Sequence, residues 1–287
     1  MRKNNSFILI AILSFLFLTS ITFYNYQQKH KKSERLILNI DIPCGLTLPF
    51  KELAAAYESA YRSTKVKTVS DSSNVLTKFV INRDNRPELF VSSGKQEIGI
   101  LMRKGLIEEE SIRPFGRYEL ILVVPKNSQI KELAGLLNDS VSKIAIANPD
   151  FNSIGVYAIQ SLRSLGYWDK LQMDKFVLFT NTSLESLSFV ATGKADATVH
   201  YNICPFRTSS DKVTEGSVKI VTQLPSDSHE PIQSYIGILK DSKNKEEAKR
   251  FINFMFSKKG NKILNRYGLG EDTLNKTKNS GFWQIKQ

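Results

Sequence analysis

The chain has 287 residues, of which 41% are hydrophobic and 24% are charged. This balance is ordinary for a globular protein, and the length is enough for one large domain or two modest ones. The net charge of +12 would attract anions or an acidic membrane surface. The chain lacks clusters of Lys and Arg with interleaved aromatic residues, so we expect no nucleic-acid partner.

Residues 1–35 are typical of a targeting segment. Arg2 and Lys3 precede an apolar run from Phe7 to Tyr24, and a Lys-rich polar stretch follows it. The length of the run fits both a cleaved signal peptide and a retained membrane anchor. No cysteine lies near its end, so lipoprotein processing is not expected. We therefore expect the rest of the chain to be exported, to the periplasm or to the outer face of the cytoplasmic membrane.

From residue 36 onward, strand-like and helix-like segments alternate along the chain. Strands are predicted at 36–42, 66–69, 88–91, 118–125, 143–147, 176–179, 196–201, 218–221 and 232–239. Helices are predicted at 49–62, 74–81, 97–104, 131–137, 154–165, 184–192, 245–256 and 258–266. This order predicts an α/β fold with mostly parallel sheets and helices on both faces.

Two long apolar strands, 118–125 and 232–239, bracket a middle section with its own βαβ pattern. The simplest arrangement is a pair of lobes joined by these two crossing strands. Lobe 1 would begin with residues 36–118, and lobe 2 would span 119–230. Residues 231–287 would supply the second crossing strand and the C-terminal helices of lobe 1.

Four corners of this fold place a loop between the end of a strand and the start of a helix. They are residues 43–47, 71–74, 152–154 and 181–183, two in each lobe. Ligands of open α/β sheets bind at such positions, where helix N-termini offer unpaired backbone N–H groups and a partial positive charge. Three of these corners also carry a hydroxyl at or beside a predicted helix N-cap, so a small, fully ionised oxyanion would suit them.

The alternative is that each corner is an ordinary helix cap. Ser73 would then cap the helix at 74–81 and Ser183 the helix at 184–192, each contributing about 1 kcal/mol to helix stability.

The two cysteines, Cys44 and Cys204, allow three interpretations. They are unrelated buried residues, or they form a disulfide, or they contact a ligand such as a thiophilic metal, where His200 could join them. The sequence does not decide between these.

Enzyme chemistry is not indicated. Cys204 lies four residues after His200 on a strand-like segment, which separates the two side chains by about 13 Å, too far for a nucleophile and its base. No Gly-rich phosphate loop, HExxH or CxxC motif is present. We predict a protein that is not an enzyme, with no cofactor and no dedicated metal site.

The order and spacing of several motifs resemble the molybdate-binding, ModA-like substrate-binding proteins of ABC transporters, over roughly residues 36–270. The motifs are GLTLPFKELAAAYE (45–58), SSNVLTKFV (72–80), LMRKGLI…YELILVVPKNS (101–128), KIAIANPDFNSIGVYA (143–158), LGYWDKL (165–171), FVATGKADATVHY (189–201) and AKRFINFMFS…ILNRYG (248–268). The resemblance implies the two-lobed type II periplasmic binding protein fold, which agrees with the arrangement above.

In that family the oxyanion is held by two serine hydroxyls, two backbone N–H groups and a tyrosine hydroxyl. The resemblance implies that Ser73 is the second serine, that Ile154 and Ser183 are the backbone donors, and that Tyr201 is the tyrosine. The first serine is replaced by Gly45, whose amide, or the hydroxyl of Thr47, would have to substitute. The predicted ligand-binding residues are Gly45, Thr47, Ser72, Ser73, Ser153, Ile154, Ser183 and Tyr201, with Cys44 and Cys204 as further cleft residues.

The resemblance implies a monomeric receptor outside the cytoplasm that binds molybdate or tungstate and delivers it to an ABC permease, with membrane contact through the N-terminal segment. Two alternatives stay open. The same fold could bind another solute, a metal ion or a thiophilic oxyanion, through Cys44 and Cys204, or it could be a sensor ectodomain.

Overall fold

The computed structural model describes residues 35–202 and 217–270. Most of the predicted targeting segment, Cys204 and the tail from residue 271 lie outside the described residues. Within the described ranges, no helix is both long enough and apolar enough to cross a membrane. The strands form two five-stranded sheets, which confirms the predicted α/β fold. The sheets are not mostly parallel as predicted, because each combines parallel and antiparallel strand pairs. The lobe boundaries 36–118, 119–230 and 231–287 stay a prediction.

Lobe 1 contains the sheet with strand order β2-β1-β3-β10-β4, in which β1 and β3 are parallel and β10 is antiparallel to β3 and β4. Its strands are β1 (Leu36–Pro43), β2 (Thr64–Asp71), β3 (Leu89–Ser92), β4 (Arg113–Tyr118) and β10 (Ile232–Ile238). Its helical segments are η1 (Cys44–Leu46), α2 (Thr47–Ala60), α3 (Ser73–Asn82), α4 (Lys95–Arg103), η2 (Glu109–Ser111), α8 (Lys245–Met255) and α9 (Lys258–Arg266).

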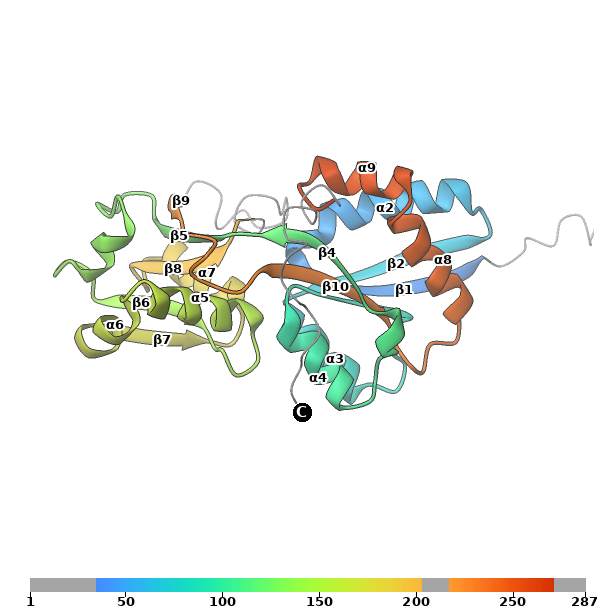
Figure 1. Cartoon of the computed structure of the whole chain (residues 1–287), viewed down its shortest axis with the longest axis horizontal. Coiled ribbons are helices and arrows are strands. Elements are labelled where there is room, and N and C mark those ends of the chain that lie inside the picture. Colours follow the sequence, from blue (N-terminus) through green and yellow to red (C-terminus); the bar gives the residue numbers. More distant parts are fainter. Residues whose placement is uncertain (1–34, 203–216, 271–287) are drawn as a thin grey trace, which may run out of the picture. The chain divides into compact units, whose positions relative to one another are not determined.

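Helices cover both faces of this sheet, with α2, α8 and α9 on one side and α3 and α4 on the other (Figure 1). Aromatic rings fill the first layer, where Phe50 of α2 packs against Phe115 and Phe251. An aliphatic cluster fills the second layer and includes Leu76 of α3 and Leu101 of α4. Each helix therefore buries the apolar side that its residue spacing creates.

Lobe 2 contains the sheet with strand order β7-β6-β8-β5-β9, in which β6 is parallel to β7 and β8, and β5 is antiparallel to β8 and β9. Its strands are β5 (Leu120–Pro125), β6 (Lys143–Ala147), β7 (Phe176–Thr180), β8 (Ala197–Tyr201) and β9 (Val218–Gln223). Its helical segments are η3 (Leu133–Leu137), α5 (Ser153–Ser164), α6 (Trp168–Asp174) and α7 (Ser183–Ala191).

Two predicted elements differ from the structure, and one helix was not predicted. The strand predicted at 118–125 is divided, because β4 ends at Tyr118 and β5 begins at Leu120. Tyr118 pairs with Ile232 in lobe 1, whereas Leu120 pairs with Tyr201 in lobe 2, so the chain changes sheets at Glu119. The helix predicted at 131–137 is only the 3₁₀ segment η3, and helix α6 was not predicted.

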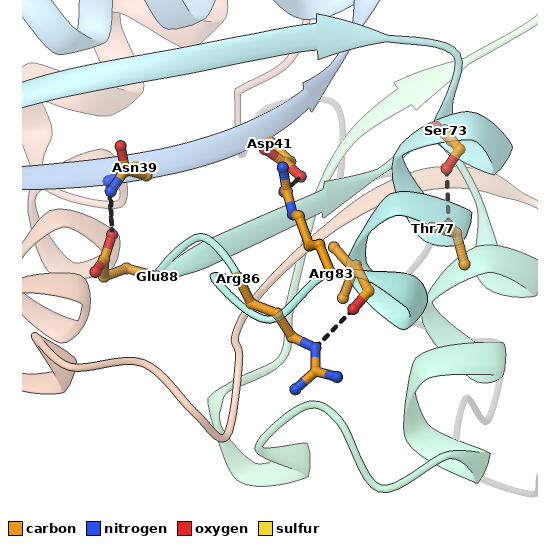
Figure 2. A network of polar contacts seen from close by, with 8 residues as sticks. Asn39, Asp41, Ser73, Thr77, Arg83, Arg86 and Glu88 are labelled. Carbon is orange, nitrogen blue, oxygen red and sulfur yellow. Dashed lines mark hydrogen bonds and ion pairs between the residues drawn. The ribbon is translucent and has the colours of Figure 1, made fainter.

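A polar network fixes α3 to the neighbouring strands (Figure 2). Arg83, just after α3, forms an ion pair with Asp41 of β1, and the Arg86 Nε donates to the Val80 carbonyl at 2.6 Å. The backbone N–H of Asn39 in β1 donates to the Glu88 carboxylate at 2.8 Å. This network holds the C-terminal end of α3 in place. Because the helix is a rigid element, its first turn is positioned as well.

Asp41 carries the electrostatic cost of this network. It is 1% exposed, and burial raises the pKa of its carboxyl to about 6, although the Arg83 charge and hydrogen bond act in the opposite direction. The ion pair therefore only partly offsets the cost of removing the carboxylate from water.

Helix α5 lies unusually close to the end of β6. A Cβ added at Gly155 would lie 1.9 Å from the Ala147 carbonyl oxygen and 3.0 Å from the Pro149 nitrogen. Only glycine allows this approach of backbone to backbone, which brings the first turn of α5 over the carboxyl end of the strand.

We predict that Asp41 lowers stability as pH rises from about 4 to about 6. Because its pKa is raised in the folded protein, the folded state binds the proton more tightly than the unfolded chain does, so stability is lost as pH rises through the folded value. Asp41→Asn should show a smaller loss of unfolding free energy than the wild type over this interval, measured by urea denaturation. Asp84→Asn, at an exposed carboxylate after α3, should keep the wild-type slope. Equal slopes in all three proteins would contradict the prediction.

We predict that Gly155→Ala destabilises the protein by about 1–3 kcal/mol, because the new methyl group overlaps backbone that cannot move aside easily. Gly99→Ala in α4 is the matched control, since a Cβ there would meet only the flexible end of Arg103 at 3.3 Å. The control should be neutral or stabilising by up to about 1 kcal/mol, because alanine is the better helix former. Urea unfolding of both variants checks this, and similar stability changes would rule out the close approach.

Candidate functional site

Three of the four predicted corners meet at the backbone carbonyl of Asn181. The Asn74 Nδ2 in the first turn of α3 donates to this oxygen at 2.8 Å, and the Asn152 Nδ2 before α5 donates to it at 3.2 Å. Asn181 itself precedes α7. One carbonyl oxygen therefore joins the start of a lobe 1 helix to the starts of two lobe 2 helices.

The remaining corner, at η1, is linked to the strand that leads into α3. The Thr47 hydroxyl donates to the Cys44 carbonyl at 2.7 Å and lies 2.8 Å from the Ser70 hydroxyl near the end of β2. Thr47 would have to release the Cys44 carbonyl before it could donate to a ligand. Gly45 is buried and Cys44 is half-buried in this turn.

At the start of α3, the N-cap is Ser72 rather than Ser73, and Ser73 is the first helical residue. Ser72 is 2% exposed, and its hydroxyl has no hydrogen-bond partner among the described residues. The Asn74 Oδ1 is likewise buried without a partner in this part of the chain. Buried polar atoms are normally paired because leaving one unpaired costs about 1–3 kcal/mol. The start of α3 therefore has the features of a place where a polar guest supplies missing bonds.

Ser73 is supported by a residue that the sequence analysis did not select. The Ser93 amide N–H donates to the Ser73 hydroxyl at 3.2 Å, and the two hydroxyl oxygens lie 2.8 Å apart. With Ser93 donating, Ser73 keeps its own proton for a ligand. Ser93 follows β3, and a hydroxyl just beyond the end of a parallel strand was the available signal.

The first turn of α5 leaves one amide unused. The N-cap is Asn152, and the Ser153 N–H donates to the Glu97 carboxylate at 3.1 Å. The Gly155 N–H donates to the Asn152 carbonyl at 3.1 Å. The Ile154 N–H, between them, forms no hydrogen bond with any residue that the structure describes. This is the amide that the family resemblance selects as a donor.

At the start of α7, the N-cap is Thr182 rather than Ser183. The Thr182 hydroxyl accepts the Glu185 N–H at 3.0 Å, and the Glu185 carboxylate accepts the Asn181 N–H at 2.7 Å. Ser183 is therefore the first residue of the helix, and a backbone donor is what this position can offer.

His200 supports α7. Its Nε2 lies 3.2 Å from the Ser183 carbonyl, and burial lowers the pKa of the imidazole to about 4, so the ring is neutral near pH 7. Among the residues that the structure describes, no group of three or more His, Cys, Asp or Glu side chains could hold a metal ion. Cys204 lies outside these residues, so the three interpretations of the cysteines stay open.

Tyr201 ends β8, next to the point where the chain changes sheets. It is buried, and its ring packs on Tyr118 with ring centres 5.4 Å apart. The Tyr118 hydroxyl is in turn hydrogen-bonded to the Ser234 hydroxyl. A ring from lobe 1 therefore packs against Tyr201 of lobe 2.

Glu97 was not predicted from the sequence. Among the residues that the structure describes, it is the only one whose carboxylate accepts hydrogen bonds from the first turn of α5. It is buried in lobe 1, and both of its oxygens bind Ser153. Burial raises the pKa of Glu97, and the bonds from Ser153 oppose that rise. A glutamate in a first turn usually caps its own helix, so nothing in the sequence pointed to α5.

The chain matches a family model described as bacterial extracellular solute-binding protein over residues 38–270. It is 28% identical over 270 residues to the putative ABC transporter substrate-binding lipoprotein YvgL of Bacillus subtilis, which covers 93% of this chain and 98% of that protein. It is 23% identical over 232 residues to the molybdate-binding protein ModA of Escherichia coli, covering 78% of this chain and 85% of that protein.

Among solved structures, the sulfate-binding protein SubI of Mycobacterium tuberculosis has a TM-score of 0.66 at 15% identity. The match covers 82% of this chain and 86% of that one. This likeness confirms the two-lobed binding-protein fold, and the ModA relative confirms the resemblance found in the motifs. The chain belongs to the bacterial extracellular solute-binding proteins, and it is a binding protein rather than an enzyme.

Proposed function

We propose that this protein binds a small tetrahedral oxyanion, molybdate or tungstate, between its lobes and delivers it to an ABC permease. One observation carries the proposal: the Asn181 carbonyl joins the starts of α3 and α5, one from each lobe, and each start keeps a donor with no partner among the described residues. The buried Ser72 hydroxyl comes from α3 in lobe 1, and the Ile154 amide comes from α5 in lobe 2.

The chemistry of these donors suits a fully ionised anion. Hydroxyl and amide groups at helix starts donate hydrogen bonds, and the helix dipoles add partial positive charge without a full cation. Ser73 and Tyr201 would add hydroxyl donors, and Ser183 a second backbone donor. A ligand that bonds to both lobes favours the state in which they are close together.

The relatives support the class of ligand and the partner. ModA of E. coli is a molybdate-binding protein, and YvgL of B. subtilis is named a putative substrate-binding protein of an ABC transporter. We further propose that the chain acts as a monomer in the periplasm or on the outer face of the cytoplasmic membrane, where residues 1–35 direct or anchor it.

A second candidate ligand is a thiophilic oxyanion or a metal ion. The observation in its favour is the first corner, where glycine replaces the expected serine and the Thr47 hydroxyl is already bonded to the Cys44 carbonyl. Isothermal titration with molybdate, tungstate, sulfate and a thiophilic metal distinguishes the two. Heat with molybdate or tungstate supports the first proposal, and heat with the metal alone supports the second.

We predict that Ser73→Ala and Tyr201→Phe each weaken binding of molybdate or tungstate by about 1.5–3 kcal/mol, the value of a hydrogen bond to a charged partner. Titration calorimetry measures the change. Ser164→Ala, at the exposed far end of α5, and Tyr167→Phe are the matched controls and should bind like the wild type. Unchanged affinity in both test variants would place the pocket elsewhere.

We predict that Ser72→Ala has opposite effects on stability and binding. Without ligand, removing a buried, unpartnered hydroxyl should leave the protein as stable as the wild type or slightly more stable. With ligand, the variant should bind the oxyanion about tenfold or more weakly, because a donor to the anion is lost. Thermal unfolding with and without molybdate measures both effects. A variant that is less stable without ligand and binds normally would show that the hydroxyl is structural.

A further inference from the structure

Helices α4 and α5 begin against each other, one from each lobe, and neither is capped by its own N-cap side chain. The N-cap of α4 is Gly94, which has no side chain, and that of α5 is Asn152, whose side chain makes no capping bond. The first amides of both helices therefore need acceptors from elsewhere.

Each helix caps the other. The Glu97 carboxylate of α4 accepts the Ser153 N–H at 3.1 Å through one oxygen and the Ser153 hydroxyl through the other. The Ser153 hydroxyl in turn accepts the Gln96 N–H at 3.1 Å. The Glu97 side chain thus satisfies one amide of lobe 2, and the Ser153 side chain satisfies one amide of lobe 1. This is the capping-box pattern divided between two helices.

The sequence and burial around this pair are adapted to it. A Cβ at position 94 would lie 2.3 Å from both the Cβ and the hydroxyl oxygen of Ser153, so any side chain there would push the helices apart. Glu97 is 2% exposed and Ser153 is 1% exposed, so water does not compete for these bonds. The Gln96 side chain adds a bond to the Pro149 carbonyl at 2.8 Å.

The position of Ser153 connects this pair to the candidate site. Ser153 immediately precedes Ile154, whose amide is unused, and the amides of a first helical turn point in nearly the same direction. Fixing the Ser153 amide against Glu97 therefore fixes the direction of the Ile154 amide.

We propose that Glu97 and Ser153 form a clasp between the lobes, and that Glu97 is a positioning residue for the Ile154 donor. The clasp stands on the hydrogen bonds alone, whereas the positioning role rests on the proposed function. A clasp that holds the lobes together before the ligand arrives lowers the cost of reaching the binding-competent state.

Hydrogen exchange of the full chain without ligand tests the clasp. The Ser153 amide should be protected in the wild type and should exchange about tenfold faster in Glu97→Ala, although the change is in the other lobe. Ser153→Ala should likewise expose the Gln96 amide. Glu246→Ala, in the exposed first turn of α8, is the control and should alter neither amide. Rapid exchange of both amides in the wild type, or no response to either substitution, would overturn the clasp.

Titration with molybdate tests the positioning role. Glu97→Gln keeps an acceptor for the Ser153 N–H and removes the charge, so it should bind molybdate at least as well as the wild type. Glu97→Ala should bind about tenfold more weakly than Glu97→Gln, since only the alanine variant loses the orientation of the Ile154 amide. Equal affinity of the two variants would overturn the positioning role. If the wild type binds none of molybdate, tungstate and sulfate, the proposed function fails, and the exchange experiment still decides the clasp.

Discussion

The first backbone amides of a helix have no acceptor inside it, and in this protein the ways in which α3, α4, α5 and α7 satisfy them organise the region between the lobes. Helix α7 is capped by Thr182 and Glu185 within its own loop. Helices α4 and α5 cap each other through Glu97 and Ser153. What is left over, a buried serine hydroxyl at α3 and one amide at α5, is the chemistry available to an anion.

These donors are neutral, and their setting explains why no cation has to join them. The buried Glu97 carboxyl lies beside the start of α5 and, when ionised, would oppose an anion, but it is bound by the same helix terminus that would attract the guest. The basic excess of the chain acts at longer range, where it draws anions toward the protein without choosing among them. For the proposed oxyanion ligand, selection would then depend on the size of the space and the number of donors.

Much of the fold followed from the sequence because periodicity is a local signal. The alternation of apolar strands and amphipathic helices predicted both sheets, and the corners at 71–74, 152–154 and 181–183 predicted helix starts that the structure brings to one carbonyl. The cap positions were displaced by one residue in α3 and α7, since adjacent hydroxyl residues look alike in sequence. Glu97 could not be recognised, because its partner lies 56 residues away in the chain, whereas the position of Ser93 just after a strand was a signal that could have been used. The break at Glu119 was hidden because Tyr118 and the apolar residues of β5 read as one continuous strand on either side of it.

That break determines how a motion of one lobe would reach the other. Glu119 is the single residue between β4 of one sheet and β5 of the other, and its backbone is held by a hydrogen bond. Its carbonyl accepts the Asn202 N–H at 3.0 Å, and Asn202 directly follows Tyr201. A rotation about this joint would therefore move the residue beside the tyrosine, so one connection between the lobes is coupled by a backbone hydrogen bond to one wall of the proposed cavity.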